Sequence, residues 1–193
     1  MRPSPEIIRR MLRGLAIRVG DALPVSHGSL GSSLKIRLFS AAGMNVAQPL
    51  FIDRGFRCIQ PRHISIGHHS SFGHDNHIWA FTPVRIGHHT MTAKDLLIIS
   101  ASHDVSTFEP LGGQEITIGP GCWIGARVTI LGGVTIGTGC VIGAGAVVRT
   151  SLPDWSIAAG VPAKVLRRRE APEKIWHQFG WYDRSELEAT YAG

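Results

Sequence analysis

The sequence lacks the features that would mark a membrane protein or a nucleic-acid-binding protein. No run of 18 apolar residues occurs among its 193 residues, so no transmembrane helix is expected. The basic N-terminus is followed by neither an apolar core nor a cleavage site, which argues against a signal peptide. The net charge is +6, yet no helix-turn-helix, zinc finger or alternation of aromatic and basic residues accompanies it. We therefore do not predict nucleic acid as a partner.

What the chain does contain is a six-residue repeat between residues 118 and 148. One strict period joins the aliphatic residues Ile118, Ile124, Ile130, Ile136, Ile142 and Val148. A period of six matches neither an α-helix nor a long strand, and it is typical of a parallel β-helix. Each hexad then supplies a short strand and a tight corner, where the glycine that follows most of these residues tolerates backbone angles that a Cβ would penalise. Three such faces close one coil.

The same pattern continues upstream with interruptions. Weaker or shifted triplets occur at Val46, Ile52 and Cys58, at Ile66, Phe72 and Ile78, and at Ile86, Thr92 and Ile98. The period then breaks over roughly residues 104–115 and resumes at Ile116. We predict an all-β protein whose parallel β-helix has about five coils, with one loop extruded near 104–115. This assigns 1–43 to an N-terminal helical and loop cap, 44–152 to the β-helix, and 153–193 to a C-terminal arm.

The two flanks are expected to contain helices. Residues 4–19 form an amphipathic pattern whose apolar stripe comprises Ile7, Ile8, Met11, Leu12, Leu15 and Val19. We expect this helix to cover the open first coil, and peripheral contact with an anionic membrane surface is the alternative. A second short helix is expected at 34–41, and the C-terminal arm is expected to be helical at 172–180 and 184–191.

Cysteine is scarce, and its placement argues against disulfides. The three cysteines are an odd number without metal-type spacing. Cys122 and Cys140 are 18 residues apart, so their side chains should stack in neighbouring coils with Cβ atoms about 4.8 Å apart, which is longer than a disulfide prefers. We expect reduced core cysteines in a cytoplasmic protein.

One histidine stands where the repeat breaks. His103 follows the third coil directly before the extruded loop, and an imidazole there can act as a general base near neutral pH. A surface histidine at the start of a loop is the alternative that the spacing alone leaves open. The chain has no GxSxG motif, so no covalent intermediate on a serine is expected.

Three segments make the sequence similar to a known family: ISASHD (99–104), the repeat at 116–148, and SIAAGVPAKVLR (156–167). They resemble the hexapeptide-repeat acyltransferases, in particular the branch that contains maltose and galactoside O-acetyltransferases and capsular or colanic-acid acetyltransferases. The resemblance implies left-handed coiling, an acetyl-CoA donor without a metal, and a homotrimer with three sites at subunit interfaces. It also implies that an acyl group is transferred directly to a sugar hydroxyl, in surface polysaccharide biosynthesis.

The resemblance assigns roles to individual residues. His103 takes the position of the catalytic base. The positions that contact CoA in the family correspond to Ala126, Ala144, Arg149, Thr150, Lys164 and Arg167, and the basic ones are chemically suited to its phosphates. On the acceptor side, Asp75 and Asn76 lie near a position that faces across the trimer interface. Asp104 either orients the imidazole or shapes the loop, and Trp123 either lines the pantetheine groove or packs on the outer face.

Three alternatives stay open. Ten histidines suggest a metal site like that of the γ-class carbonic anhydrases, but position 108, five residues after His103, is Phe108, and the pairs at 68–69 and 88–89 occupy corner positions that usually face solvent. No metal is therefore expected. The second alternative is N-acetylation of an amino sugar, and the third is a non-catalytic β-helix scaffold.

Overall fold

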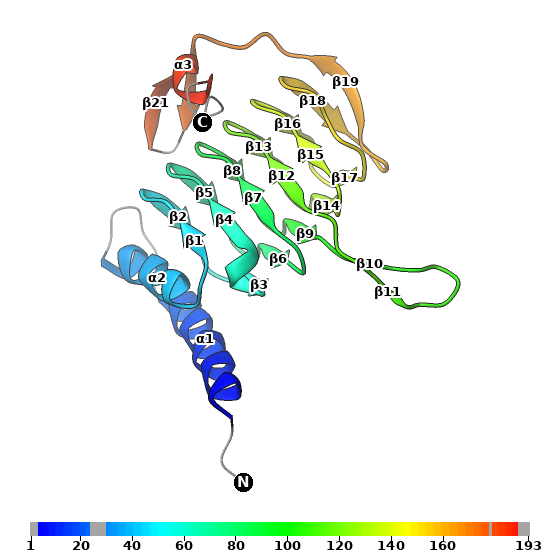
Figure 1. The fold of residues 1–193 in the computed structure, drawn as a ribbon. Coiled ribbons are helices and arrows are strands. Elements are labelled where there is room, and N and C mark those ends of the chain that lie inside the picture. The colour runs from blue at the N-terminus through cyan, green and yellow to red at the C-terminus, as the bar shows by residue number, and fades with distance from the viewer. Residues whose placement is uncertain (1–3, 24–29, 178, 189–193) are drawn as a thin grey trace.

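The computed structural model describes residues 4–23, 30–177 and 179–188 of the chain. Their centre is a parallel β-helix with three sheets, here called A, B and C, whose short strands stack in register (Figure 1). Sheet A contains β1 (Asn45–Val46), β4 (Ile64–Ile66), β7 (Val84–Ile86), β12 (Ile116–Ile118) and β15 (Thr135–Ile136). Sheet B contains β2 (Leu50–Ile52), β5 (Ser70–Phe72), β8 (Met91–Thr92), β13 (Trp123–Ile124), β16 (Val141–Ile142) and β18 (Ser156–Ala159). Sheet C contains β3 (Arg57–Ile59), β6 (His77–Trp79), β9 (Leu97–Ile99), β14 (Thr129–Leu131) and β17 (Val147–Val148).

These strands form five complete coils and a partial sixth. The first coil consists of β1, β2 and β3, which confirms the weak triplet of the sequence. The parallel pairing continues past residue 152, because Leu152 bridges Ile136 and β18 pairs with β16. The expected all-β architecture of about five coils is therefore confirmed, with one partial coil added at the C-terminal end.

The core is the inside of this shaft, and the repeat predicts its members. All six aliphatic residues of the strict period are at most 1% exposed. The small residues that precede them are equally buried: Cys122, Val128, Val134, Cys140 and Ala146. Cys122 and Cys140 are free thiols, as expected, and their sulfur atoms donate to backbone carbonyl oxygens of the neighbouring coil or corner.

The glycine that follows four of these six aliphatic residues is needed for close packing rather than for an unusual backbone angle. A Cβ on Gly119 would lie 2.7 Å from the carbonyl carbon of Gly137 in the next coil. Left-handed backbone occurs two residues further on instead, at Gly121 with φ 66° and at Gly139 with φ 63°. The sequence-based reason for this glycine was therefore wrong, although its place in the repeat was predicted.

Two helices precede the shaft. Helix α1 (Pro5–Ala22) starts at Ser4, whose hydroxyl accepts a hydrogen bond from the Ile7 amide, and α2 (Leu30–Ala41) follows. The first coil is covered by α2, which buries Ile36 and Phe39, while most of α1 extends away from the shaft (Figure 1). The expectation that the 4–19 helix covers this coil was therefore wrong. Its apolar stripe is 43–66% exposed, and contact with a membrane surface stays a prediction. Among the described residues, no helix has the length and apolarity that crossing a membrane requires.

A buried lysine fixes α2 against the end of the shaft. Lys35 is fully buried, and its ammonium donates to the backbone carbonyls of Ile52 and Asp53. Asp21, near the end of α1, lies 3.7 Å from the same nitrogen and accepts a hydrogen bond from the Phe56 amide. Burial lowers the pKa of Lys35, and the Asp21 carboxylate opposes that shift.

The C-terminal arm is mostly extended. Strand β19 (Lys164–Arg168) pairs antiparallel with β18 at the edge of sheet B. A hairpin of β20 (Lys174–His177) and β21 (Gly180–Asp183) follows, and then the short helix α3 (Arg184–Glu188). The helix expected at 172–180 is instead part of this hairpin, in which exposed and buried side chains alternate: Trp176 and Trp181 are exposed, while His177 and Tyr182 are buried. The helix expected at 184–191 is found over 184–188, and its remainder lies outside the described residues.

Candidate active site

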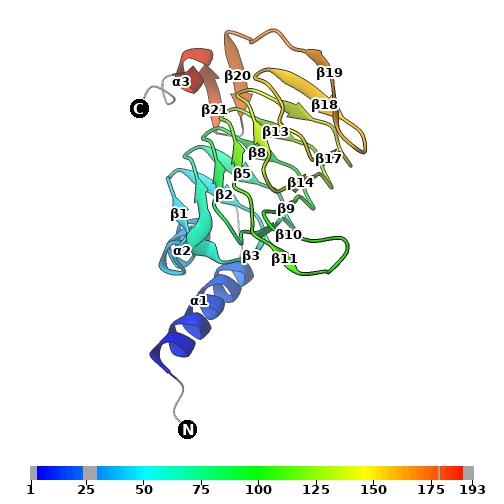
Figure 2. The same ribbon diagram turned by 45° about the vertical axis from the view of Figure 1, so that its right-hand side comes forward.

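The connections between sheets form three corners, which are named here by the sheets they join. Corner AB contains residues 67–69, 87–89, 119–121 and 137–139; corner BC contains 73–76, 93–95, 125–127 and 143–145; corner CA contains 60–63, 80–83, 100–115, 132–133 and 149–151. The extruded loop leaves the shaft at corner CA, between the third and fourth coils, as expected (Figure 2). It contains the antiparallel strands β10 (Ser102–His103) and β11 (Pro110–Leu111).

The loop holds the His103 imidazole in one tautomer. Nδ1 of His103 lies 2.8 Å from the backbone oxygen of Phe108. A carbonyl oxygen only accepts, so Nδ1 must carry the proton that is donated in this bond. In the neutral ring, Nε2 is then left with its lone pair on the exposed side chain. This is the arrangement that a general base requires.

Asp104 shapes the loop rather than contacting the imidazole. Its Oδ1 accepts hydrogen bonds from the backbone amides of Ser106 and Thr107 at 2.8 and 2.9 Å, and from the Thr107 hydroxyl. These bonds lower the pKa of Asp104. They also tighten the turn that carries the Phe108 carbonyl back to His103. Of the two roles that the sequence left open for Asp104, the structure favours the loop-shaping one.

A groove lies at the base of the loop. Its volume is about 520 Å³, and it is lined by residues of three successive coils. Arg149 and Thr150, both predicted to contact CoA, lie in this groove beside Ser102, the neighbour of His103. Sequence reasoning missed Gln114 and Gly132, which also line it. The signal that identifies them is register, because residues at the same corner of successive coils become neighbours.

Three other predicted donor-binding residues gather at corner BC. Ala126 and Ala144 occupy equivalent positions in the fourth and fifth coils, where the Gly145 amide donates to the Ala126 carbonyl at 2.8 Å. Lys164 lies beyond these two alanines along the shaft, because it pairs with Ala159 at the end of β18, the strand that follows β16 in sheet B. Ala144 and Lys164 are exposed and Ala126 is half-buried, so a ligand has access to this edge.

Trp123 and Arg167 lie on the outer face of sheet B. Trp123 is 53% exposed in β13, and Arg167 pairs with Ile157 from the edge strand β19. Neither residue belongs to the corner that carries His103. Contact of Trp123 with pantetheine stays a prediction.

The two predicted acceptor residues differ in their surroundings. Asp75 is exposed at corner BC and accepts a hydrogen bond from Nδ1 of His74 at 2.9 Å, and this bond lowers its pKa. Asn76 is fully buried inside the shaft. Its amide donates to the Thr92 hydroxyl and accepts from the Leu96 amide. Asn76 therefore stabilises the corner and offers no group to solvent.

The paired histidines of corner AB do not face solvent as expected. His88 and His89 are each 5% exposed, because the hairpin of β20 and β21 packs over this corner (Figure 2). The ring of Tyr182 in that hairpin packs against the His89 ring, with centroids 4.2 Å apart and planes tilted by 31°. The sequence treated the C-terminal arm and these corners separately, so it gave no signal for this contact.

Comparison with known proteins identifies the family. The bacterial transferase hexapeptide (six repeats) family matches residues 115–150. WcaF of Escherichia coli strain K12, whose assigned role is acetyl transfer in colanic acid biosynthesis, is 30% identical over 139 residues, which cover 72% of this chain and 75% of WcaF. This chain belongs to the hexapeptide-repeat acetyltransferase family. The chain spans 35%, 59% and 62% of the length of three other curated relatives.

Solved structures of hexapeptide-repeat proteins share the fold. A maltose O-acetyltransferase from Clostridium difficile 630 superposes with a TM-score of 0.74 at 23% identity, over 86% of this chain and 88% of that protein. A hexapeptide-repeat acetyltransferase from Vibrio cholerae, solved with acetyl-CoA, superposes with a TM-score of 0.58 at 22% identity, over 87% of this chain and 91% of that protein. At these identities, the superpositions establish the common architecture.

Proposed function

We propose that the protein transfers an acetyl group from acetyl-CoA to a hydroxyl group of a sugar, with His103 as the general base. The observation that carries this proposal is the hydrogen bond from Nδ1 of His103 to the Phe108 carbonyl, which leaves Nε2 to accept a proton. Membership of the hexapeptide-repeat acetyltransferase family supports the reaction class.

The reaction proceeds by direct transfer. Nε2 of His103 removes the proton of the acceptor hydroxyl as its oxygen attacks the thioester carbonyl carbon of acetyl-CoA. The tetrahedral intermediate collapses, the carbon–sulfur bond breaks, and the CoA sulfur leaves with the proton held by the imidazolium. The products are the acetyl ester and free CoA, and His103 returns to its starting tautomer.

Two basic groups of residues suit the donor. Arg149 lies in the groove beside the His103 loop, while Lys164 and Arg167 lie on β19. Guanidinium and ammonium groups bind phosphate oxygens well, and CoA carries several of them. The complex of the Vibrio cholerae relative with acetyl-CoA supports this choice of donor.

Because the predicted residues lie at two different corners, we propose that each site is completed by a second copy of the chain. His103, Arg149 and Thr150 belong to corner CA, whereas Ala144 and Lys164 belong to corner BC or its continuation. Between the two corners, sheet C carries an outward row of apolar side chains in register, namely Ile59, Trp79, Ile99 and Leu131. Ile59 and Trp79 are 39% and 42% exposed, which favours their burial against another subunit. A closed ring of three chains satisfies this arrangement with three equivalent sites.

For the acceptor we propose a sugar of a surface polysaccharide or its precursor. The colanic acid role assigned to WcaF and the maltose acceptor of the Clostridium difficile relative support a carbohydrate hydroxyl. We propose a cytoplasmic location, since all three cysteines are free thiols.

The test is thiol release from acetyl-CoA over a panel of sugars, lipid-linked sugars, amino sugars and serine. We expect turnover with a hydroxyl acceptor and a loss of about 10²-fold or more in His103→Ala. His63→Ala is the matched control, because Nδ1 of His63 also lies 2.8 Å from a carbonyl oxygen, that of Ala80, at the same corner. The control should keep wild-type activity.

Three results contradict the proposal. Turnover only with amino sugars, with the acetyl group on nitrogen in the NMR spectrum of the product, would establish N-acetylation instead. Equal losses in His63→Ala and His103→Ala would mean that the effect is structural. The absence of both thiol release and acetyl-CoA binding by calorimetry would favour a non-catalytic scaffold.

A further inference from the structure

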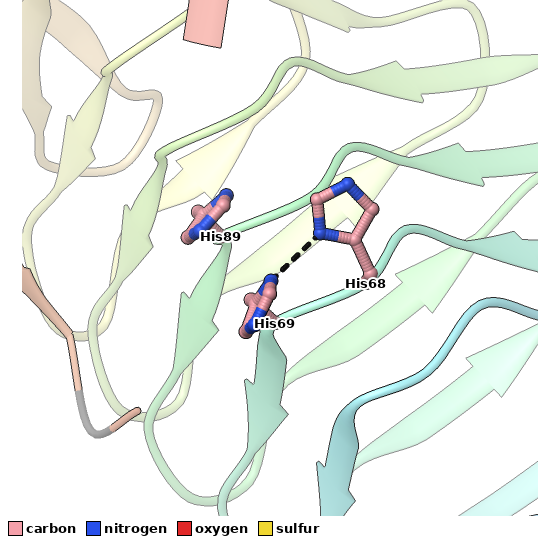
Figure 3. A group of neighbouring side chains, drawn as sticks. All are labelled: His68, His69 and His89. Carbon is pink, nitrogen blue, oxygen red and sulfur yellow. Dashed lines mark hydrogen bonds between the residues drawn. The ribbon is translucent and has the colours of Figure 1, made fainter. Parts of the chain in front are cut away.

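Four histidines of two successive coils meet at corner AB, away from the His103 loop. Nδ1 of His68 lies 2.8 Å from Nδ1 of His69, and the same distance separates these atoms in His88 and His89. The second pair stacks on the first, with ring centroids 4.9 Å apart for His68 and His88 and 4.8 Å apart for His69 and His89. Figure 3 shows His68, His69 and His89 with their rings close together and the hydrogen bond between the first two.

At this corner two histidines adopt a left-handed backbone conformation that glycine adopts more easily. His69 and His89 both have φ 54°, in the left-handed region that disfavours residues with a Cβ. The equivalent positions of the next two coils are Gly121 and Gly139, with φ 66° and 63°. The same conformation occurs at Asp75, Asp95 and Trp155, so it is a general property of the corners of the coil.

A small cavity adjoins the histidines. Its volume is about 100 Å³, and it is lined by His69 and His89 together with His177, Tyr182 and Glu186 of the C-terminal arm. Glu186 lines the same cavity and brings a carboxylate to it. The cavity therefore leaves space next to His69 and His89, with an acidic residue in its wall.

We propose that His68, His69 and His89 bind one divalent transition-metal ion, such as Zn²⁺, Ni²⁺ or Cu²⁺. One nitrogen of each ring lies within 4.8 Å of those of the other two. Nitrogens around a tetrahedral ion lie about 3.3 Å apart for bonds of about 2.0 Å, so binding would require the rings to rotate until their nitrogens face one ion. Imidazole is a preferred ligand of these ions. This proposal departs from the sequence-based expectation of no bound metal.

The ion would have a structural role. Corner AB is separate from corner CA, where the proposed catalytic base lies, so the metal takes no part in acetyl transfer. It would link the second and third coils directly beneath the hairpin of β20 and β21. Binding of the metal should therefore raise the stability of the folded chain without changing the rate of acetyl transfer.

The proposal is tested by titrating the metal-free protein with Zn²⁺, Ni²⁺ and Cu²⁺ by calorimetry. We expect one ion per chain, a rise of the unfolding midpoint with metal, and affinity at least about 10-fold weaker in His69→Gln/His89→Gln. The matched control is His74→Gln/His77→Gln, which removes two histidines outside the cluster and should bind as the wild type does. Equal weakening in both double variants, or no binding by the wild type, would overturn the site.

A measurement on the wild type covers the case in which the double variant fails to fold. Electron paramagnetic resonance of the Cu²⁺-loaded protein should show coupling to two or three imidazole nitrogens. Coupling to one nitrogen or none would overturn the proposal, whatever the variants do.

Discussion

At the scale of single residues, the proposed chemistry depends on how the loop orients one imidazole. His103 is exposed, so packing does not hold its ring, and its orientation comes from the Phe108 carbonyl. Phe108 has φ 56°, and its amide donates to the Asp104 carbonyl, so the turn is tightly closed. Asp104 closes the same turn with its side chain. The aspartate beside the histidine therefore acts on the base through the backbone.

Replacing Asp104 by alanine should lower kcat while the fold is kept. Without its carboxylate the turn loosens and His103 loses its fixed tautomer and direction, which we expect to reduce kcat roughly 10- to 100-fold with little change in KM for acetyl-CoA. Because the pKa of Asp104 is lowered, its support of the turn is complete above the ordinary carboxyl range and is lost only as the pH falls through the lowered value. Steady-state kinetics, with hydrogen exchange at the Ser106 and Thr107 amides, measures both effects. Glu109→Ala removes another carboxylate of the loop as a control, and an unchanged kcat in Asp104→Ala would refute this role.

At the scale of elements, the coils depend on backbone segments that approach each other too closely for a side chain. The inward isoleucines supply the apolar core, but the glycine next to them sets how closely the corners stack. This makes glycine at the corners and glycine in the N-terminal helix physically different. Gly119 faces the backbone of the next coil, whereas Gly14 in α1 has open space around it.

Alanine should therefore have opposite effects at these two glycines. A Cβ at position 119 would lie 2.7 Å from backbone atoms of Gly137 and Thr138, and we expect Gly119→Ala to reduce the free energy of unfolding by about 1–3 kcal/mol. Gly14→Ala meets nothing within 4 Å in a helix interior and should add about 0.5–1 kcal/mol. Urea unfolding of the two variants beside the wild type measures the difference, and changes of the same sign would show that contact with the next coil does not restrict position 119.

At the scale of the whole molecule, one chain holds two incomplete halves of the proposed site. Corner CA offers the base, and corner BC offers an accessible edge for the donor, with the apolar outer face of sheet C between them. Because the corners of one shaft lie apart, we propose that the two halves meet when chains associate. The exposed apolar row on sheet C gives that association a driving force.

Mixed oligomers should recover activity from two inactive chains. His103→Ala removes the base, and Ala144→Trp fills the exposed donor edge at the other corner. If each site joins the two corners of neighbouring chains, co-expression of both variants should restore about a quarter of the wild-type rate. In a randomly mixed ring, about a quarter of the interfaces combine an intact His103 of one chain with an intact Ala144 of its neighbour. The mass of the complex by light scattering should correspond to three chains. No recovery in mixed complexes, with each variant folded and inactive alone, would place the whole site within one chain.

The sequence by itself determined the architecture of the shaft and the place of its interruption. A strict period of six dictates which side chains point inward, so the core from Ile66 to Val148 and the loop that carries His103 follow from spacing alone. The tertiary structure decided what depends on contacts between distant segments. It covered the first coil with α2 instead of α1, turned residues 172–180 into a hairpin, and buried His88 and His89 beneath it. In the tertiary structure Asn76 is buried in the core, and the proposed base and part of the predicted donor edge lie at two different corners. A local repeat encodes the direction of each side chain relative to its own strand, but not which remote segment will pack against it.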